Sequence, residues 1–249
     1  MSSLEGKTAL VSGGSRGIGA ATAKKLAAEG ARVAVNYSGS QARAEQVVAE
    51  IEASGGEAFA VKADVADAAE VAAMFAEIDR RFEGKLDVLF ANAGVYEMAP
   101  VQDADLDHYQ KTLDVNVRGV ITVVLEGVKR LRDHGRIVVT GSVIGDRVPF
   151  PGLSAYAMSK SAVQGLVRGW ARDLGPRQIT VNCVQPGPIN TEMNPDVEEN
   201  PAVEAHKELT ALSRYGQPEE IAEAVAYLAG PAGAFVTGGT LNVDGGIFV

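Results

Sequence analysis

The chain has 249 residues, of which 46% are hydrophobic and 22% are charged, and its formal net charge is -9. This composition is typical of a folded α/β protein with a large core, and it gives no indication of disorder. The negative charge, without a local basic patch, argues against binding to nucleic acid or to an anionic membrane.

Apolar runs of strand length alternate along the chain with segments of helix length. This alternation predicts parallel strands joined by crossover helices. We therefore expect an α/β fold in which one domain, residues 1–249, forms a Rossmann-like, doubly wound parallel sheet of seven strands flanked by helices. The strand-like runs lie at 7–12, 31–37, 57–63, 86–91, 135–141, 179–185 and 240–244.

The first strand-like run ends in a glycine-rich turn, Ser12 to Gly19, which leads into a helix-like segment. Because Gly13, Gly17 and Gly19 lack a Cβ atom, the backbone can approach a ligand closely, and the N–H groups that open the helix can bind a phosphate anion. A strand before the turn and a helix after it are the context of a dinucleotide-binding fingerprint. The alternative is a structural strand-to-helix turn.

Two later helices carry additional signals. One is expected to follow Asp67 as its N-cap, and the other to begin with Pro218 and to end before Gly230. Each has an apolar stripe at helical spacing. The stripes are Val71, Met74, Phe75, Ile78 and Phe82, and Ile221, Ala224, Val225 and Leu228.

The least regular stretch is 186–216, which contains Pro186, Pro188, Pro195 and Pro201. A long irregular segment in a compact domain is commonly a lid or a binding loop. We expect a substrate flap at about 188–215.

Polar and small residues follow several predicted strands at the points where those strands end. Ligands bind beyond the carboxyl ends of the strands in a sheet of this kind, so this edge is predicted to be the active site. After the glycine turn, these residues are Tyr37 and Ser38, Asp64, Asn92 to Gly94, Ser142, and Pro186 with Gly187.

Tyr156 and Lys160 are four residues apart in a helix-like segment, which sets an ammonium group beside a phenol. A neighbouring cation favours the phenolate, so we expect the pKa of Tyr156 to be depressed and the pair to act as a tuned acid. Taken alone, the same spacing also fits a packed, solvated helix face.

Other kinds of site have little support. The single cysteine, Cys183, lies in an apolar run and is expected to pack as a small hydrophobe, and the three histidines show no metal-ligand spacing, so no metal is predicted. No apolar stretch approaches about 18 residues, and residues 1–7 lack the features of a signal peptide. We expect a cytoplasmic protein.

Taken together, these residues resemble the short-chain dehydrogenase/reductase family, and the resemblance spans essentially the whole chain. Ser12, where the family usually has threonine, and Ala91, where many members have asparagine, are small departures. The matching elements are Gly13-x-x-x-Gly17-x-Gly19, Asp64-Val65, Asn92-Ala-Gly94, Asn116, Ser142, Tyr156-x-x-x-Lys160, Pro186-Gly187 and Asn242-Val-Asp-Gly-Gly246.

The resemblance implies that Tyr156 donates a proton to a substrate carbonyl oxygen and that Ser142 hydrogen-bonds the same oxygen. Lys160 would depress the pKa of Tyr156 and bind the nicotinamide ribose. Asn116 would hold a water that links Lys160 to solvent, or else be a helix-bending amide. The implied cofactor-binding residues are Gly13, Ser15, Arg16, Gly17, Ile18, Gly19, Tyr37, Ser38, Asp64, Val65, Asn92, Ala93, Gly94, Tyr156, Lys160, Pro186, Gly187, Ile189 and Thr191.

The end of the second predicted strand indicates the choice of cofactor. An acidic side chain there would accept the ribose hydroxyls of NAD, but Tyr37 stands at that position and neutral hydroxyls follow it. Arg16 in the glycine turn can face a 2′-phosphate. The sequence therefore favours NADP(H) over NAD(H).

The substrate is less clearly indicated. Overall the chain is similar to 3-oxoacyl-carrier-protein reductases, but of the two basic positions that dock the carrier protein, Arg177 remains and the other is Asp133. Residues 141–149, 185–190 and 214–218 are closer to the branch that contains the cyclic-di-GMP-binding biofilm dispersal mediator, although Arg147 and Arg214 are the only obvious arginines for a dinucleotide. We expect an NADPH-dependent carbonyl reductase acting on a ketone or 3-oxo compound, with a carrier-protein reductase and a cyclic-dinucleotide-binding protein as alternatives. The chamber walls are expected to include Tyr96, Val143, Ile144, Phe150 and Met193.

The resemblance also implies a homotetramer built through the helices at 104–132 and 155–175 and the carboxyl-terminal strand. The apolar tail Ile247-Phe-Val249 would then be buried in a neighbouring subunit, or else fold on its own subunit.

Overall fold

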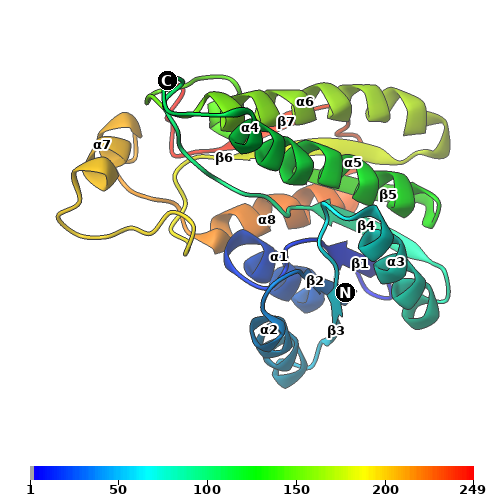
Figure 1. Cartoon of the computed structure of the whole chain (residues 1–249). Helices are drawn as coiled ribbons and strands as arrows, with labels where there is room; N and C mark the ends of the chain where they lie inside the picture. Colours follow the sequence, from blue (N-terminus) through cyan, green and yellow to red (C-terminus); the bar gives the residue numbers. More distant parts are fainter. Residues whose placement is uncertain (1–2) are drawn as a thin grey trace.

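The computed structural model describes residues 3–249 and contains one parallel seven-stranded sheet in the order β3-β2-β1-β4-β5-β6-β7. The predicted doubly wound fold is confirmed (Figure 1). The strand order reverses where β1 pairs with β4, which opens a crevice at the carboxyl ends of these two strands. The strands are β1 (Thr8–Val11), β2 (Arg32–Tyr37), β3 (Glu57–Lys62), β4 (Leu86–Ala91), β5 (Leu131–Thr140), β6 (Thr180–Pro186) and β7 (Thr240–Val243).

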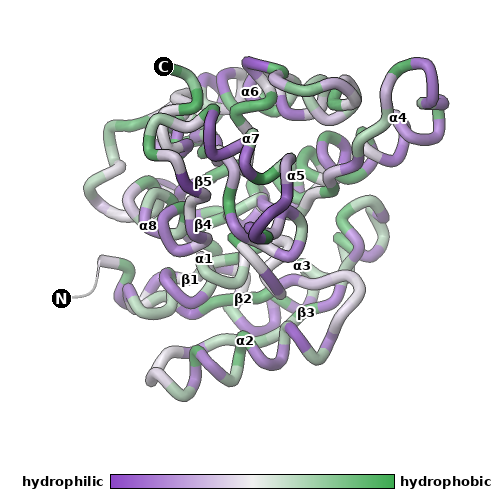
Figure 2. The backbone as a smooth tube through the Cα atoms, turned by 90° about the vertical axis from the view of Figure 1, so that its left-hand side faces the viewer, coloured by the Kyte–Doolittle hydropathy of each residue, from purple (hydrophilic) through white to green (hydrophobic). Residues whose placement is uncertain are grey.

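Helices cover both faces of the sheet. One face packs against α1 (Gly17–Ala28), α2 (Gln41–Ala53) and α8 (Pro218–Ala229). The opposite face packs against α3 (Ala68–Phe82), α5 (Val120–Val128) and α6 (Ser154–Leu174). In Figure 2 the tube of α2 alternates between hydrophilic and hydrophobic colours, as expected for a helix with one buried face.

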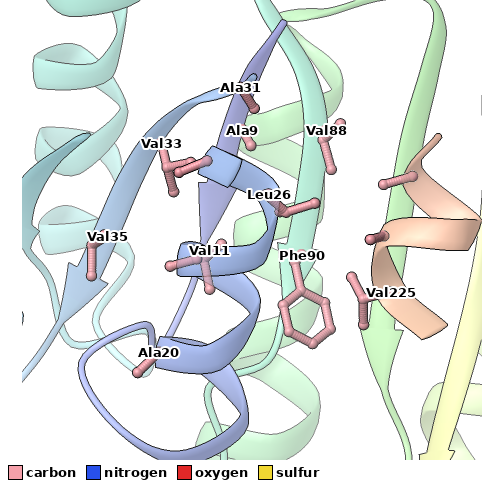
Figure 3. Packing of buried hydrophobic residues seen from close by; sticks show 14 of the residues in the cluster. Ala9, Val11, Ala20, Leu26, Ala31, Val33, Val35, Val88, Phe90 and Val225 are labelled. Carbon is pink, nitrogen blue, oxygen red and sulfur yellow. The ribbon is translucent and has the colours of Figure 1, made fainter. Parts of the chain in front are cut away.

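Alternate residues of each central strand enter the two cores, because side chains of a strand point to opposite faces. On β1, Ala9 and Val11 face α1 and α8, whereas Leu10 faces the opposite core. Figure 3 shows Val11, Phe90 of β4 and Val225 of α8 gathered in the first of these cores. This packing fixes the start of α1, and therefore the glycine turn, against the sheet.

Both helices with strong sequence signals are confirmed. The Asp67 carboxylate accepts hydrogen bonds from the N–H groups of Ala69 and Glu70 at the start of α3. At the start of α8, the Glu220 carboxylate accepts a hydrogen bond from the Gln217 N–H, and the helix ends before Gly230. The predicted stripe of α3 is buried along its whole length.

Strand β5 begins at Leu131, four residues before the predicted start at 135. Leu131 pairs with Leu86, and the register then shifts before the regular pairing resumes at Val88 and Arg136. The early part of the strand carries exposed polar residues, including His134 at φ 65, so it gives no apolar signal.

The irregular stretch 186–216 contains a helix that the sequence did not predict, α7 (Pro201–Leu209). Asn200 caps it, Pro201 opens it, and Val203 is its one buried residue, so its apolar pattern is too short to be recognised. Figure 1 shows α7 at the left of the view, away from the sheet. Two shorter helices, α4 (Leu106–Leu113) and the π-helical turn Asp114–Gly119, precede α5. Among residues 3–249, no helix has both the length and the apolar character to cross a membrane.

Candidate active site

The carboxyl ends of the strands open into a cavity of about 630 Å³. All the residues expected to bind a cofactor line it, together with Ser142, whereas Asn116 does not. They are Gly13, Ser15, Arg16, Gly17, Ile18, Gly19, Tyr37, Ser38, Asp64, Val65, Asn92, Ala93, Gly94, Tyr156, Lys160, Pro186, Gly187, Ile189 and Thr191.

The glycine turn leaves no room for side chains. A Cβ atom at Gly13, where φ is 63, would lie 2.8 Å from the Ala93 Cα, and one at Gly19 would lie 2.1 Å from the Gly13 carbonyl oxygen. Asn92 holds the turn from β4, because its Nδ2 donates to the carbonyl oxygens of Ser12 and Gly13, both at 3.2 Å. The backbone of the turn is thereby fixed as a bare surface next to the first N–H groups of α1, which suits a pyrophosphate.

Two arginine side chains also line this cavity. Arg16 and Arg43 both line the cavity, together with Ser38 and Ser40. Arg43 was not predicted, because it lies in the first turn of α2, beyond the strand end to which the sequence argument was confined. Its Nη1 lies 4.0 Å from Oε1 of Glu192, and both side chains are about half exposed. Two guanidinium groups with adjacent hydroxyls are a donor set that fits a phosphate monoester.

Ser142 follows β5 and begins the short 3-10 turn Val143–Gly145. Its Oγ accepts a hydrogen bond of 3.2 Å from the Ile144 N–H. Because a hydroxyl has one proton to donate and this contact uses a lone pair, Ser142 can still donate its proton to the Tyr156 oxygen or to a ligand oxygen.

Tyr156 and Lys160 lie on the first two turns of α6. The Lys160 Nζ donates to the Thr140 carbonyl oxygen at 2.8 Å and lies 5.5 Å from the centroid of the Tyr156 ring. Thr140 in turn donates from Oγ1 to Asn92 Oδ1 at 3.1 Å, which connects α6 to the glycine turn through β5 and β4.

The expectation that Lys160 depresses the pKa of Tyr156 is wrong. Burial raises the pKa of Tyr156 to about 12, hydrogen bonding with Ser142 acts in the opposite direction, and the neighbouring Tyr96 adds to the rise. The ammonium group of Lys160 faces the phenol ring and bonds the Thr140 carbonyl. Burial lowers the pKa of Lys160 itself to about 8. At pH 7 the phenol is therefore protonated, as a proton donor must be, and most Lys160 side chains are charged.

Asn116 is buried in the π-helical turn behind the cavity. Its Oδ1 accepts from the Val95 N–H at 2.8 Å, and its Nδ2 donates to the Val95 carbonyl oxygen and to Ser159 Oγ. Both amide hydrogens are therefore used in joining the loop after β4 to α6, which agrees with the structural alternative for this residue. The water relay remains a prediction.

The remaining wall of the cavity is largely apolar. Tyr96 packs edge-on against Tyr156, with ring centroids 4.9 Å apart. Val143, Ile144 and Met193 line the cavity as expected. Phe150, which was expected in the wall, does not line the cavity. Its ring packs instead against that of His206, a lining residue on α7 that the sequence did not indicate.

Two further sequence expectations concern residues near the site. Cys183 is a buried free thiol in β6, and burial raises its pKa to about 11. Within residues 3–249 there is no group of three or more His, Cys, Asp or Glu side chains arranged to hold a metal ion.

Comparison with known proteins agrees with this geometry. Residues 13–247 match the family model described as Enoyl-(Acyl carrier protein) reductase. The Cyclic-di-GMP-binding biofilm dispersal mediator protein of Escherichia coli (strain K12) is 42% identical over 245 residues, which are 98% of this chain and 98% of that protein. The 3-oxoacyl-[acyl-carrier-protein] reductase of Synechocystis sp. is 41% identical over 250 residues, covering 99% of each.

A solved structure gives a similar result. The short chain dehydrogenase from Burkholderia cenocepacia J2315 in complex with NADP superposes with a TM-score of 0.95 at 46% identity, covering 99% of this chain and 100% of that one.

Proposed function

Because the chain belongs to the short-chain dehydrogenase/reductase family of oxidoreductases, we propose that it is an NADPH-dependent carbonyl reductase acting on a small or medium ketone or 3-oxo compound. The observation that carries this proposal is the convergence of Ser142, Tyr156 and Lys160 on the cavity that also contains the glycine turn. Residues 188–215 would form the flap over the substrate within a single catalytic domain.

In the proposed reaction NADPH, when bound, supplies the hydride. The Tyr156 hydroxyl gives its proton to the carbonyl oxygen of the substrate, and the Ser142 hydroxyl donates a hydrogen bond to the same oxygen. The Lys160 Nζ, held by the Thr140 carbonyl oxygen 5.5 Å from the centroid of the Tyr156 ring, would bind the nicotinamide ribose and so fix the cofactor relative to the proton donor. Tyr96 and Ile144 line the cavity beside these groups, and an apolar group next to the substrate carbonyl would pack against them.

NADP(H) is favoured over NAD(H) because two guanidinium groups, those of Arg16 and Arg43, line the groove where a 2′-phosphate would lie. The solved Burkholderia relative, which is in complex with NADP, supports this choice.

Removing either arginine is expected to raise the KM for NADPH by about tenfold, because one charge-assisted hydrogen bond to the 2′-phosphate is lost. The KM for NADH should stay nearly unchanged, because NADH has no 2′-phosphate. Steady-state kinetics of Arg16→Ala and Arg43→Ala with both cofactors measure this. The matched control is Arg80→Ala, which removes an exposed arginine of α3. A wild-type preference for NADH would refute the cofactor assignment.

The two alternatives have less support from the geometry. Arg177, the remaining basic position for a carrier protein, donates from Nε to Asp133 Oδ1 at 2.9 Å and from Nη1 to the Val128 carbonyl oxygen. Arg147 donates to the Ile247 carbonyl oxygen, and Arg214 forms a bidentate pair with Glu220. The arginines that could bind a carrier protein or a cyclic dinucleotide thus already have partners within the chain.

A ketone panel with NADPH absorbance as the readout, together with calorimetric titration of cyclic-di-GMP with and without NADPH, tests this ranking. We expect turnover of at least one ketone or 3-oxo ester and no heat of binding from the dinucleotide. Micromolar dinucleotide binding without any turnover would reverse the order of the two functions.

We also propose that the protein is a homotetramer. Large apolar side chains are exposed on the elements expected to form its interfaces: Leu106 is 86% exposed and Leu125 56% exposed. In the tail, Ile247 is buried within its own subunit, whereas Val249 is 98% exposed. Only the last residues of the tail are therefore available to a neighbour.

Light scattering at low micromolar concentration is expected to give a mass of four times 26.0 kDa. Leu125→Glu, which places a charge in the expected interface, should reduce that mass. A particle of 26.0 kDa in the wild type would count against the interface assignment.

A further inference from the structure

The turn that carries Ser142 is held from outside by side chains that do not line the cavity. Within the turn, the Gly145 N–H donates to the Ser142 carbonyl oxygen at 2.9 Å, and the Asp146 N–H donates to the Val143 carbonyl oxygen. A turn of three residues has few bonds of its own, so the direction of the Ser142 hydroxyl depends on what fixes the turn.

Gln185 of β6 contacts this turn from the sheet side. Its side chain is fully buried, and its Nε2 donates to the Ser142 carbonyl oxygen at 2.8 Å and to Asp146 Oδ2 at 2.9 Å. Both partners can only accept, so the orientation of the amide follows from chemistry. Within the described chain its Oε1 has no hydrogen-bond partner. The two bonds from Nε2 therefore fix the orientation of this amide.

Gln164 of α6 contacts the same turn through Asp146. Its Nε2 donates to Asp146 Oδ1 at 3.0 Å, so both carboxylate oxygens of Asp146 are held by amide groups from different elements. The backbone from Gly141 to Gly145 also packs closely against α6 and β6. A Cβ atom at Gly145 would lie 2.9 Å from Gln164 Nε2, and one at Gly141 would lie 2.5 Å from the Cys183 Sγ.

We propose that Asp146, clamped between Gln185 and Gln164, is a positioning residue that aims the Ser142 hydroxyl at the substrate carbonyl. The proposal rests on the proposed reductase function, because it assigns these three side chains an effect only through Ser142. None of the three lines the cavity, so none is expected to touch substrate or cofactor.

A double-mutant cycle with Ser142→Ala tests this directly. In the wild-type background, Gln185→Leu and Asp146→Leu are each expected to lower kcat for ketone reduction at least about tenfold and up to about 100-fold, because a misplacement of about 1 Å can cost about 100-fold. The Kd for NADPH, measured by fluorescence, should stay within about twofold of wild type. In the Ser142→Ala background, the same substitutions should cause no further loss, because they act through a hydroxyl that is already absent.

Two matched variants separate positioning from general weakening. Asp146→Asn keeps an acceptor for Gln185, and Gln164 can turn its amide to meet the new Nδ2, so this variant should retain most of the activity lost in Asp146→Leu. Gln46→Leu removes an exposed glutamine of α2 that donates only to Glu50, and it should leave kcat unchanged.

The outcomes distinguish this proposal from the proposed function. Losses of kcat that multiply with the loss in Ser142→Ala, or an unchanged kcat in Asp146→Leu, would overturn the positioning role alone. Unchanged turnover in Ser142→Ala itself would overturn the function assigned to Ser142 and the positioning role with it. If Gln185→Leu fails to fold, the double-mutant cycle is measured with Asp146→Leu and Asp146→Asn alone, because Asp146 is at an exposed position.

Discussion

Replacing Tyr156 with phenylalanine is expected to lower kcat for ketone reduction by about 10²–10⁴-fold, because the substitution removes the proton that the carbonyl oxygen must receive. The ring remains, so its edge-on packing with Tyr96 and its contact with Lys160 are retained. The KM for NADPH should therefore change little. Steady-state kinetics with the best ketone of the panel measure both quantities.

Tyr227→Phe is the matched control, since this tyrosine is 45% exposed on α8, away from the cavity. It should retain wild-type activity. Turnover in Tyr156→Phe at the level of this control would mean that another group, or water, protonates the substrate.

The second large effect is expected on stability. Asp87 is the second residue of β4, in the centre of the sheet, and its side chain is 8% exposed. The carboxylate pairs with Arg132 of β5 and with Lys7, which precedes β1. Its Oδ2 also accepts from the Thr8 N–H at 2.9 Å. Asp87→Ala leaves that N–H and a guanidinium group without their partner, so we expect a loss of about 3–5 kcal/mol in the free energy of unfolding.

The effect should depend on pH in a defined direction. Burial alone would raise the pKa of Asp87, but the hydrogen bonds from Arg132 and Thr8 and the charge of Lys7 outweigh it, so the folded-state pKa is lowered. The stabilisation is then fully present above the unfolded pKa of about 3.9 and is lost as the pH falls through the lower folded value. Urea denaturation of wild type and Asp87→Ala at pH 7 and in acid measures the difference.

Glu57→Ala provides the comparison, because its ion pair with Arg32 is exposed and should contribute less than about 1 kcal/mol. If Asp87→Ala costs no more than Glu57→Ala, or if its cost grows on acidification, the account of this cluster is wrong.

The fold and much of the cavity wall could be predicted because their signals are local. Gly13, Gly17 and Gly19 follow an apolar run directly, and Tyr156 and Lys160 are one helical turn apart. Once parallel strands are inferred, their carboxyl ends must meet at one edge, and this places Asn92, Ser142 and Pro186 near each other without any knowledge of side-chain contacts.

What the sequence did not predict depends on contacts between distant segments or on depth. Gln185 and Asp146 are 39 residues apart, and no spacing rule connects a residue of one strand with a residue in the turn that follows another strand. The pKa of Tyr156 was predicted in the wrong direction, because helical spacing places Lys160 nearby but does not reveal how far burial disfavours the phenolate. Helix α7 was missed because it buries only Val203, so its stability depends on contacts outside the helix.

In the proposed reaction, hydride and proton reach one carbonyl group within this cavity. Reduction of a turned-over ketone with NADPH that carries deuterium at the transferable position, followed by mass spectrometry and NMR of the product, tests it most directly. We expect one alcohol per NADPH consumed, with deuterium on the carbinol carbon and a single stereoisomer in excess. NADPH that binds tightly but delivers no deuterium to any ketone or 3-oxo ester of the panel would contradict it.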